Sequence, residues 1–319
     1  MTARGLRAGT LALVVGSCMF ASACAGQDAP VPRRAGSPGA AAQAEPPRPL
    51  LWRVDDGDNT VYLLGSFHAL KPGDYPVAPA VDAAFADAER VAFELSPQEM
   101  ESPELPGLML AAATLPAGKD LRSVLPAATY AKLEGYAATR GLPLANLANI
   151  EPWFVALLVS LGEMQRVGLD PAQGLDRQLG ARAAAAGKPT SGLETAAEQI
   201  AALDSMDLAA QQQMLEEALT GVDGFKVEMD SLHALWRQGD EKGLYVRMGA
   251  DLRDRYPKLY ARINTARNDA WLPKVRALLD GEREDDALVV VGALHLLGDD
   301  GLVAKLRKAG YEVERVGDR

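Results

Sequence analysis

The sequence is 319 residues long, 48% of its residues are hydrophobic, and its formal net charge is −10. That length is enough for one large domain with a substantial hydrophobic core. An acidic chain without clusters of basic residues argues against nucleic acid as a partner and against electrostatic binding to anionic lipids. After residues 1–23, no apolar run reaches the roughly 20 residues that a membrane-spanning helix needs.

Residues 1–23 are typical of a signal peptide, because two arginines precede an apolar stretch too short to span a bilayer stably. Small residues directly before Cys24 suit lipoprotein processing, with a lipid on Cys24, and they also suit ordinary signal cleavage. We favour the lipoprotein because Cys18 lies within the leader, which leaves Cys24 as the one cysteine after export. The sequence therefore predicts an exported protein on the periplasmic side of the cell envelope. It would be lipid-anchored, and Ala25 favours the outer membrane.

Residues 24–49 are rich in Ala, Pro, Gly, Gln and Ser and contain almost no large apolar residues. Such a segment cannot bury a core, so it predicts a flexible tether. The folded domain is expected to occupy residues 50–319. With no cysteine in that domain, an intrachain disulfide is impossible, and the fold must be stabilised by its hydrophobic core.

Short apolar segments between helical patterns predict an α/β fold with a mostly parallel central sheet and flanking helices. Two of these segments are apolar on both faces, as expected for parallel strands that are covered on both sides. Helical patterns at 80–89 and 300–309 link neighbouring strands as strand–helix–strand crossovers. The predicted strands are 51–54, 61–64, 91–95, 189–193 (the weakest), 288–291 and 311–316.

The middle of the chain, from about 104 to 281, is mostly Ala, Leu, Gln, Glu and Lys with apolar residues at helical spacing. This composition predicts a large helical insertion between the two halves of the sheet. Because open α/β sheets bind ligands beyond the carboxyl ends of their strands, we expect the insertion to cover those ends.

Two of the three histidines end the same short motif, which is an apolar strand followed by Gly, two residues and His. The first motif ends Gly65-Ser-Phe-His68 and the second ends Gly292-Ala-Leu-His295. Imidazole is the commonest metal ligand and titrates near neutral pH. Since both strands would lie in one parallel sheet, His68 and His295 are expected at the same edge. The alternative is that both histidines only cap strand ends and the glycines serve packing.

Two glutamates end other predicted strands, Glu94 after Val91-Ala-Phe and Glu194 after Ser191-Gly-Leu. Two histidines and one carboxylate are an ordinary ligand set for zinc, manganese, iron or cobalt. The sequence thus predicts a site for a divalent transition metal, with His68, Glu94 and His295 as its ligands. Glu194 could then serve as the general base. The alternative for either glutamate is that it merely marks the exit of a strand to solvent.

Arg267 and Asn268 lie on a polar stretch of the helical region. Arginine can stabilise a developing oxyanion and asparagine can orient it, although composition alone favours a solvated helix face. The third histidine, His233, has no acidic or His partner four residues later and is expected to be structural.

Other catalytic schemes lack their residues. The expected domain has no cysteine and no Gly-x-Ser-x-Gly elbow, so the thiol and common serine-hydrolase routes are unsupported. Neither a G-x-x-x-x-G-K-[ST] loop, nor a G-x-G-x-x-G after a strand, nor HExxH is found.

Taken together, these residues resemble the TraB/GumN family, which is related to the Tiki membrane metalloproteases. The resemblance covers about residues 50 to 316. Its most specific part is the pair of Gly-x-x-His motifs, although the first often carries Thr where this chain has Ser66. The matching residues are Gly65-Ser-Phe-His68, Glu94, Gly192-Leu-Glu194, Arg267-Asn268-x-x-Trp271 and Gly292-Ala-Leu-His295.

The resemblance implies a divalent-metal-dependent peptidase acting on a peptide or protein substrate. Carried over, the metal ligands are His68, Glu94 and His295. The resemblance also strengthens the expectation of catalytic roles for Glu194, Arg267 and Asn268. Two alternatives stay open: a non-catalytic metal- or haem-binding lipoprotein, and a scaffold in envelope polysaccharide or secretion machinery.

Overall fold

The computed structural model describes residues 45–281 and 285–317. The expected signal peptide, Cys24 and nearly all of the expected tether lie outside the described residues. Within the described ranges, no helix is both long and apolar enough to cross a membrane.

The described residues contain one six-stranded sheet in the order β4-β3-β5-β2-β1-β6. Strands β2, β5, β3 and β4 pair in parallel, whereas β1 is antiparallel to both of its neighbours. The expectation of an α/β fold with a mostly parallel sheet is thus confirmed. The strands are β1 (Leu51–Asp55), β2 (Thr60–Ser66), β3 (Arg90–Phe93), β4 (Thr190–Gly192), β5 (Ala287–Gly292) and β6 (Glu312–Arg315).

Strand β5 lies in the middle of the sheet because every one of its side chains is apolar or glycine and buried. Its register aligns Gly292 with Ser66 of β2, and Val290 with Phe93 of β3. Phe93 in turn pairs with Gly192 of β4. The carboxyl ends of all four parallel strands therefore lie along one edge.

Two crossovers follow the expected pattern. Helix α2 (Pro79–Asp87) leads from β2 to β3, and α16 (Leu302–Lys308) leads from β5 to β6. A 3-10 turn, η7 (Ala293–Leu296), directly follows β5.

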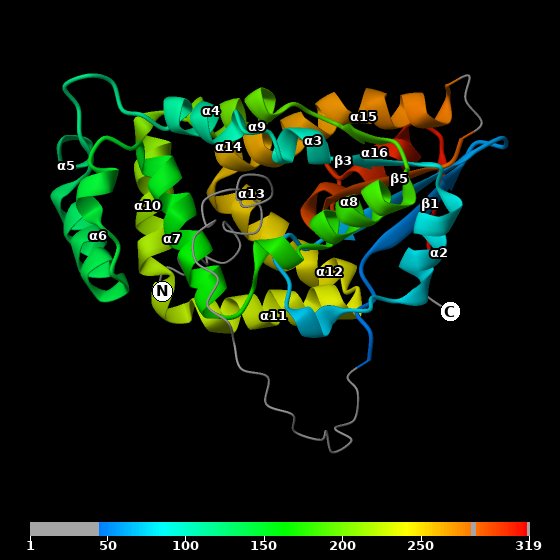
Figure 1. The fold of residues 1–319 in the computed structure, drawn as a ribbon, viewed down its shortest axis with the longest axis horizontal. Helices are drawn as coiled ribbons and strands as arrows, with labels where there is room; N and C mark the ends of the chain where they lie inside the picture. The colour runs from blue at the N-terminus through cyan, green and yellow to red at the C-terminus, as the bar shows by residue number, and fades with distance from the viewer. Residues whose placement is uncertain (1–44, 282–284, 318–319) are drawn as a thin grey trace, which may run out of the picture.

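The segment expected to be a helical insertion is helical, but β4 interrupts it and returns the chain to the sheet. In Figure 1 the sheet lies toward one end of the molecule, and α5, α6, α7 and α10 form the other end. Two π-helical segments, η5 (Tyr245–Ala250) and η6 (Ala261–Thr265), lie between the later helices. Helix α3 (Pro97–Met100) precedes this region. The α-helices within it are α4 (Leu105–Ala112), α5 (Leu121–Val124), α6 (Ala127–Arg140), α7 (Pro152–Arg166), α8 (Leu175–Ala186), α9 (Ala196–Asp204), α10 (Leu208–Thr220), α11 (Phe225–Gln238), α12 (Glu241–Leu244), α13 (Asp251–Arg255), α14 (Pro257–Tyr260) and α15 (Ala266–Leu279).

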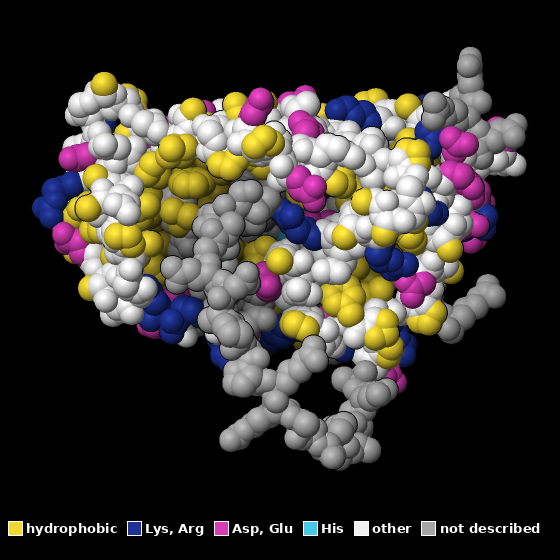
Figure 2. Space-filling view, viewed as in Figure 1, with side chains coloured by type: hydrophobic (Ala, Val, Ile, Leu, Met, Phe, Trp, Pro, Cys, Tyr) yellow, Lys and Arg dark blue, Asp and Glu magenta, His cyan; other side chains and the backbone are white. Residues whose placement is uncertain are grey.

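An apolar groove of about 350 Å³ lies between α10 and α14, lined in part by Ala210, Met214 and Leu259. Figure 2 shows hydrophobic side chains gathered around a hollow on this face of the molecule. None of the six side chains predicted to form the site lines this groove.

His233 lies in a buried polar cluster with Asp74 and Arg237. Its Nε2 is 2.8 Å from Asp74 Oδ2, and Arg237 Nη1 donates to the other oxygen. Lys71 N–H also donates to Asp74 Oδ2, at 2.8 Å. Burial opposes the charge on Asp74, but the bonds from His233, Lys71 and Arg237 outweigh burial and lower the pKa of this carboxyl. The hydrogen-bond partner of His233 is therefore Asp74, and this cluster is separate from the other two histidines.

Asp74→Asn should destabilise the fold by about 2 kcal/mol at pH 7, because it weakens the hydrogen bonds that this buried carboxylate accepts from Arg237 and Lys71. A carboxyl whose pKa is lowered by folding contributes stability above its unfolded pKa of about 3.9, and loses it as the pH falls through the folded pKa. The difference between wild type and variant should therefore shrink below about pH 4. Urea denaturation of both proteins at pH 7 and pH 3 measures this, and an equal difference at both pH values would contradict it.

Candidate active site

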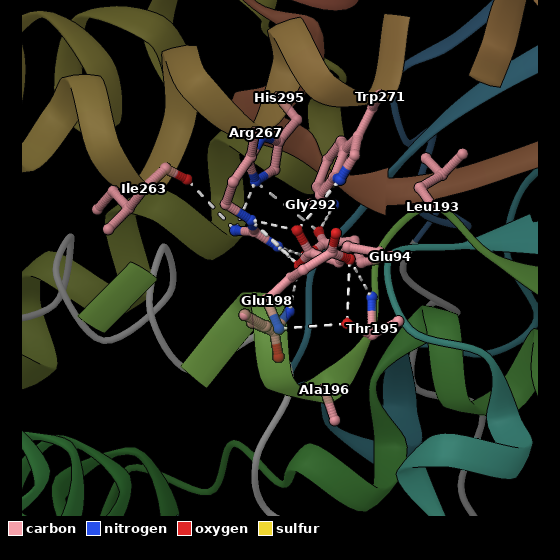
Figure 3. Close-up of polar contacts among 12 residues, drawn as sticks. Glu94, Leu193, Thr195, Ala196, Glu198, Ile263, Arg267, Trp271, Gly292 and His295 are labelled. Carbon is pink, nitrogen blue, oxygen red and sulfur yellow. Dashed lines mark hydrogen bonds and ion pairs between the residues drawn. The ribbon is translucent and has the colours of Figure 1, made fainter. Parts of the chain in front are cut away.

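The carboxyl ends of the four parallel strands bring together the six residues singled out from the sequence. His68 lies two residues after β2, Glu94 directly after β3, and Glu194 two residues after β4. His295 lies in η7, three residues after β5. The helical region supplies Arg267 and Asn268 at the start of α15. All six lie in one connected cluster, which Figure 3 shows in part, with Arg267, His295 and Glu94 pointing toward one another.

Glu94 occupies the centre of this cluster. Its Oε1 accepts the Gly292 N–H at 2.6 Å, and its Oε2 accepts Arg267 Nη2 at 2.6 Å. The Nε2 atoms of His68 and His295 are 3.6 and 4.0 Å from the same Oε1. Burial opposes the negative charge, but Arg267 and the two imidazoles outweigh burial and hold the pKa of Glu94 well below its usual range. Glu94 is therefore ionised at neutral pH.

His68 presents its two ring nitrogens to two different carboxylates. Nδ1 is 3.1 Å from Asp176 Oδ1, and Nε2 faces Glu94. Burial disfavours the imidazolium, but Asp176 and Glu94 outweigh burial and raise the pKa of His68. The strand-end histidine thus lies between two acids.

His295 is held by Asn268. Its Nδ1 is 2.7 Å from Asn268 Oδ1, and Asn268 Nδ2 donates to the Asp300 carbonyl at 2.8 Å. Because the amide nitrogen is committed to a carbonyl, the amide oxygen accepts from Nδ1–H, and Nε2 carries the lone pair. Burial and the neighbouring Arg267 lower the pKa of His295 to about 3, so the ring is neutral at pH 7. The Trp271 ring, 4.5 Å away between centroids, packs against it.

Arg267 connects the two glutamates. Its Nε lies 3.1 Å from both carboxylate oxygens of Glu194, and its Nη2 is 2.5 Å from Glu194 Oε1. Its Nη1 is 3.2 Å from His295 Nε2. Glu194 also accepts from Gln199 at 2.8 Å and from Trp271 Nε1 at 3.1 Å. Burial outweighs these donors and raises the pKa of Glu194.

Two features differ from the sequence-based expectation. Arg267 is buried among acids, so this part of the stretch is not a solvated helix face. The amide oxygen of Asn268 contacts His295, and its amide nitrogen donates to the Asp300 carbonyl. Because both amide atoms have partners, the arrangement favours a role in orienting the His295 ring over a role in orienting a substrate oxyanion.

Sequence reasoning missed Asp176 and the main-chain N–H of Gly292. Asp176 lies in the first turn of α8, where acidic residues are common in any helix, so no signal distinguished it. The Gly292 N–H is a main-chain group, so an argument from side-chain types could not identify it. Only the strand register, which places Gly292 beside the end of β3, reveals that contact.

The Arg267 guanidinium lies against two of the three side chains predicted to bind a metal, since Nη2 donates to Glu94 and Nη1 is 3.2 Å from His295 Nε2. Among the described residues, no three His, Cys, Asp or Glu side chains form a ready-made cage for one. Even so, His68 and His295 each have Nδ1 held by a neighbour, and their Nε2 atoms converge on Glu94 Oε1. Two imidazoles fixed in this way and one ionised carboxylate are a usual ligand set for a divalent transition metal.

Fold and site together define a class: an α/β domain with a buried cluster of two His, two Glu and an Arg at the carboxyl ends of its parallel strands. The model of the TraB/PrgY/gumN family matches residues 50–315, and the chain belongs to this family.

Among curated proteins, the chain is 24% identical to the uncharacterized protein YbaP of Escherichia coli over 251 residues, which are 79% of this chain and 89% of that protein. It is 23% identical to a metalloprotease TIKI homolog of the sponge Amphimedon queenslandica, over 83% of this chain and 61% of that protein. No solved structure matches the chain.

Proposed function

We propose that this protein is a metal-dependent hydrolase of the cell envelope, and specifically a peptidase. The observation that carries the proposal is that both imidazole Nε2 atoms face the ionised Glu94. The Nδ1 atom of each ring contacts a neighbouring side chain, Asp176 for His68 and Asn268 for His295. The similarity to a protein named as a metalloprotease homolog supports peptide bonds as the substrate.

In this proposal His68, His295 and Glu94 would hold the metal ion, which would be manganese, cobalt, zinc or iron. Such a metal supplies Lewis-acid polarisation of a substrate carbonyl and activation of water. The remaining chemistry belongs to the chain. Glu194 would take the proton from the attacking water as general base and return it to the leaving amine, and Arg267, whose Nη1 lies beside His295 Nε2, would donate to the developing oxyanion. Asn268 keeps the His295 ring in place.

We further propose that residues 1–23 are removed and that a lipid on Cys24 anchors the protein on the periplasmic side, in the outer membrane. The composition of the leader and the position of Cys24 support this. Labelling of cells with a radioactive fatty acid tests it, since wild type should be labelled and Cys24→Ser should not. A labelled Cys24→Ser protein would refute the anchor.

The decisive experiment is elemental analysis of the full protein, purified without chelators, beside His68→Ala and His295→Ala. We expect about one equivalent of a transition metal in wild type and none in either variant, because each variant removes one of three ligands. Only protein that contains the metal should cleave a peptide library, so wild type should be active and both variants inactive. Wild type that stays metal-free after addition of manganese, zinc and cobalt, while folded, would end the proposal. Metal without cleavage would favour a binding protein.

A further inference from the structure

One buried acid beside the site has no role in the proposed function. Asp176 is 8% exposed, lies in the first turn of α8, and is 108 residues from His68 in sequence. A helix N-terminus favours a carboxylate electrostatically, but that preference does not require burial.

Three contacts connect Asp176 to the end of β2. Ser66 Oγ donates to Asp176 Oδ1 at 2.7 Å, and the Asp176 main-chain N–H donates back to Ser66 Oγ at 3.2 Å. The same Oδ1 is 3.1 Å from His68 Nδ1. Because the hydroxyl proton of Ser66 points at Asp176, this carboxylate oxygen is an acceptor toward both neighbours.

The backbone around Asp176 is fitted closely to the His68 segment. A Cβ on Gly174 would lie 2.4 Å from the His68 carbonyl oxygen, so only glycine allows this approach. Leu175 N–H donates to the Phe67 carbonyl at 3.3 Å, and Leu70 and Asp170 exchange two main-chain hydrogen bonds. The start of α8 is thus fixed against the exit of β2 independently of the Asp176 side chain.

We infer that Asp176, held by Ser66, is a positioning residue that keeps the His68 proton on Nδ1, so that the Nε2 lone pair is left for the proposed metal on the side of Glu94. Because Asp176 Oδ1 is an acceptor and lies 3.1 Å from Nδ1, that ring nitrogen must carry the proton, whereas Glu94 Oε1 lies farther from Nε2, at 3.6 Å. Asn268 does the same for His295 with a neutral amide. The inference builds on the proposed metal site, in which groups behind a ligating imidazole fix its tautomer and raise its basicity.

The tautomer of His68 is the direct test, and it needs no metal. Two-bond ¹H–¹⁵N spectra of the metal-free protein, recorded above the pH at which the His68 signals stop shifting and the ring is neutral, distinguish a proton on Nδ1 from one on Nε2. We expect Nδ1–H in wild type. Asp176→Leu, which cannot accept, should move the proton to Nε2, and Asp176→Asn, which keeps an acceptor oxygen, should retain Nδ1–H. An unchanged tautomer in Asp176→Leu would overturn the inference.

Metal affinity is the second readout, measured by competition between the protein and a chromophoric chelator for Co²⁺. Asp176→Leu should bind about 10- to 100-fold more weakly than wild type, with Asp176→Asn between the two. Ser66→Ala should cause a smaller loss, and it substitutes for the leucine variant if that protein does not fold. Glu163→Gln, which removes a buried and paired carboxylate of α7, is the matched control and should bind as wild type.

The two proposals fail in different ways. Wild type that takes up no Co²⁺ would refute the metallohydrolase, while the tautomer measurement would still decide the role of Asp176. Wild-type binding that is equalled by Asp176→Leu would overturn the positioning role and leave the metallohydrolase intact.

Discussion

Gly292→Ala should abolish metal uptake and peptide cleavage while leaving the fold in place. A Cβ at this position would lie 2.6 Å from His68 Nε2 and 3.2 Å from Glu94 Oε1. Both atoms belong to the proposed ligand set, so the added methyl group displaces His68 from the centre of the site. Misplacement of a ligand by about 1 Å costs about 100-fold in activity. We expect losses of at least that size in cleavage and in Co²⁺ affinity.

The fold should survive because the backbone at Gly292 has φ −53° and ψ 136°, which alanine adopts without strain. The main-chain N–H that donates to Glu94 is also retained. Gly135→Ala in α6 is the matched control: a Cβ there meets nothing within 4 Å. That change should leave the site intact and stabilise the helix by about 0.5–1 kcal/mol. Wild-type metal affinity in Gly292→Ala would show that His68 does not occupy the proposed position.

Arg267→Met should destabilise the metal-free protein by about 3–5 kcal/mol at pH 7. Arg267 donates to both buried glutamates, and its guanidinium group also lies over the Trp271 ring, 4.6 Å from the centroid. Methionine fills similar volume without charge, so Glu94 and Glu194 would face each other without a counter-ion. Urea denaturation of the chelator-treated protein measures the loss in the free energy of unfolding.

Two further variants separate charge from geometry. Arg267→Lys keeps one charge but cannot reach both carboxylates in the forked arrangement, so it should also be destabilised, by less than the methionine variant. Adding Glu194→Gln to Arg267→Met removes one of the two unpaired charges and should recover about 1 kcal/mol or more. A loss below about 1 kcal/mol in Arg267→Met, or no recovery in the double variant, would mean that the guanidinium is not the counter-ion of this cluster.

The positions of His68, Glu94 and His295 followed from the sequence because each comes just after the end of an apolar strand. Glu194 follows the short polar strand β4, which was the weakest of the predicted strands. Parallel strands end at a common edge, so a local pattern was enough to predict a shared location. Strand β5 is the clearest case, since an unbroken run of buried apolar residues has few other places to lie than the middle of a sheet. The metal and catalytic roles of these residues stay predictions until metal is measured.

What each side chain contacts depended on pairings between distant parts of the chain. Arg267 and Glu94 are 173 residues apart, and His68 and Asp176 are 108 apart. The sequence therefore determined which strand ends carry the reactive groups, because that depends on periodicity within a few residues. Only the tertiary structure decided that Asn268 holds His295, that Arg267 bridges two acids, and that Asp176 lies behind His68. Those contacts arise from how separate helices pack against the sheet, and no local pattern in the sequence encodes that packing.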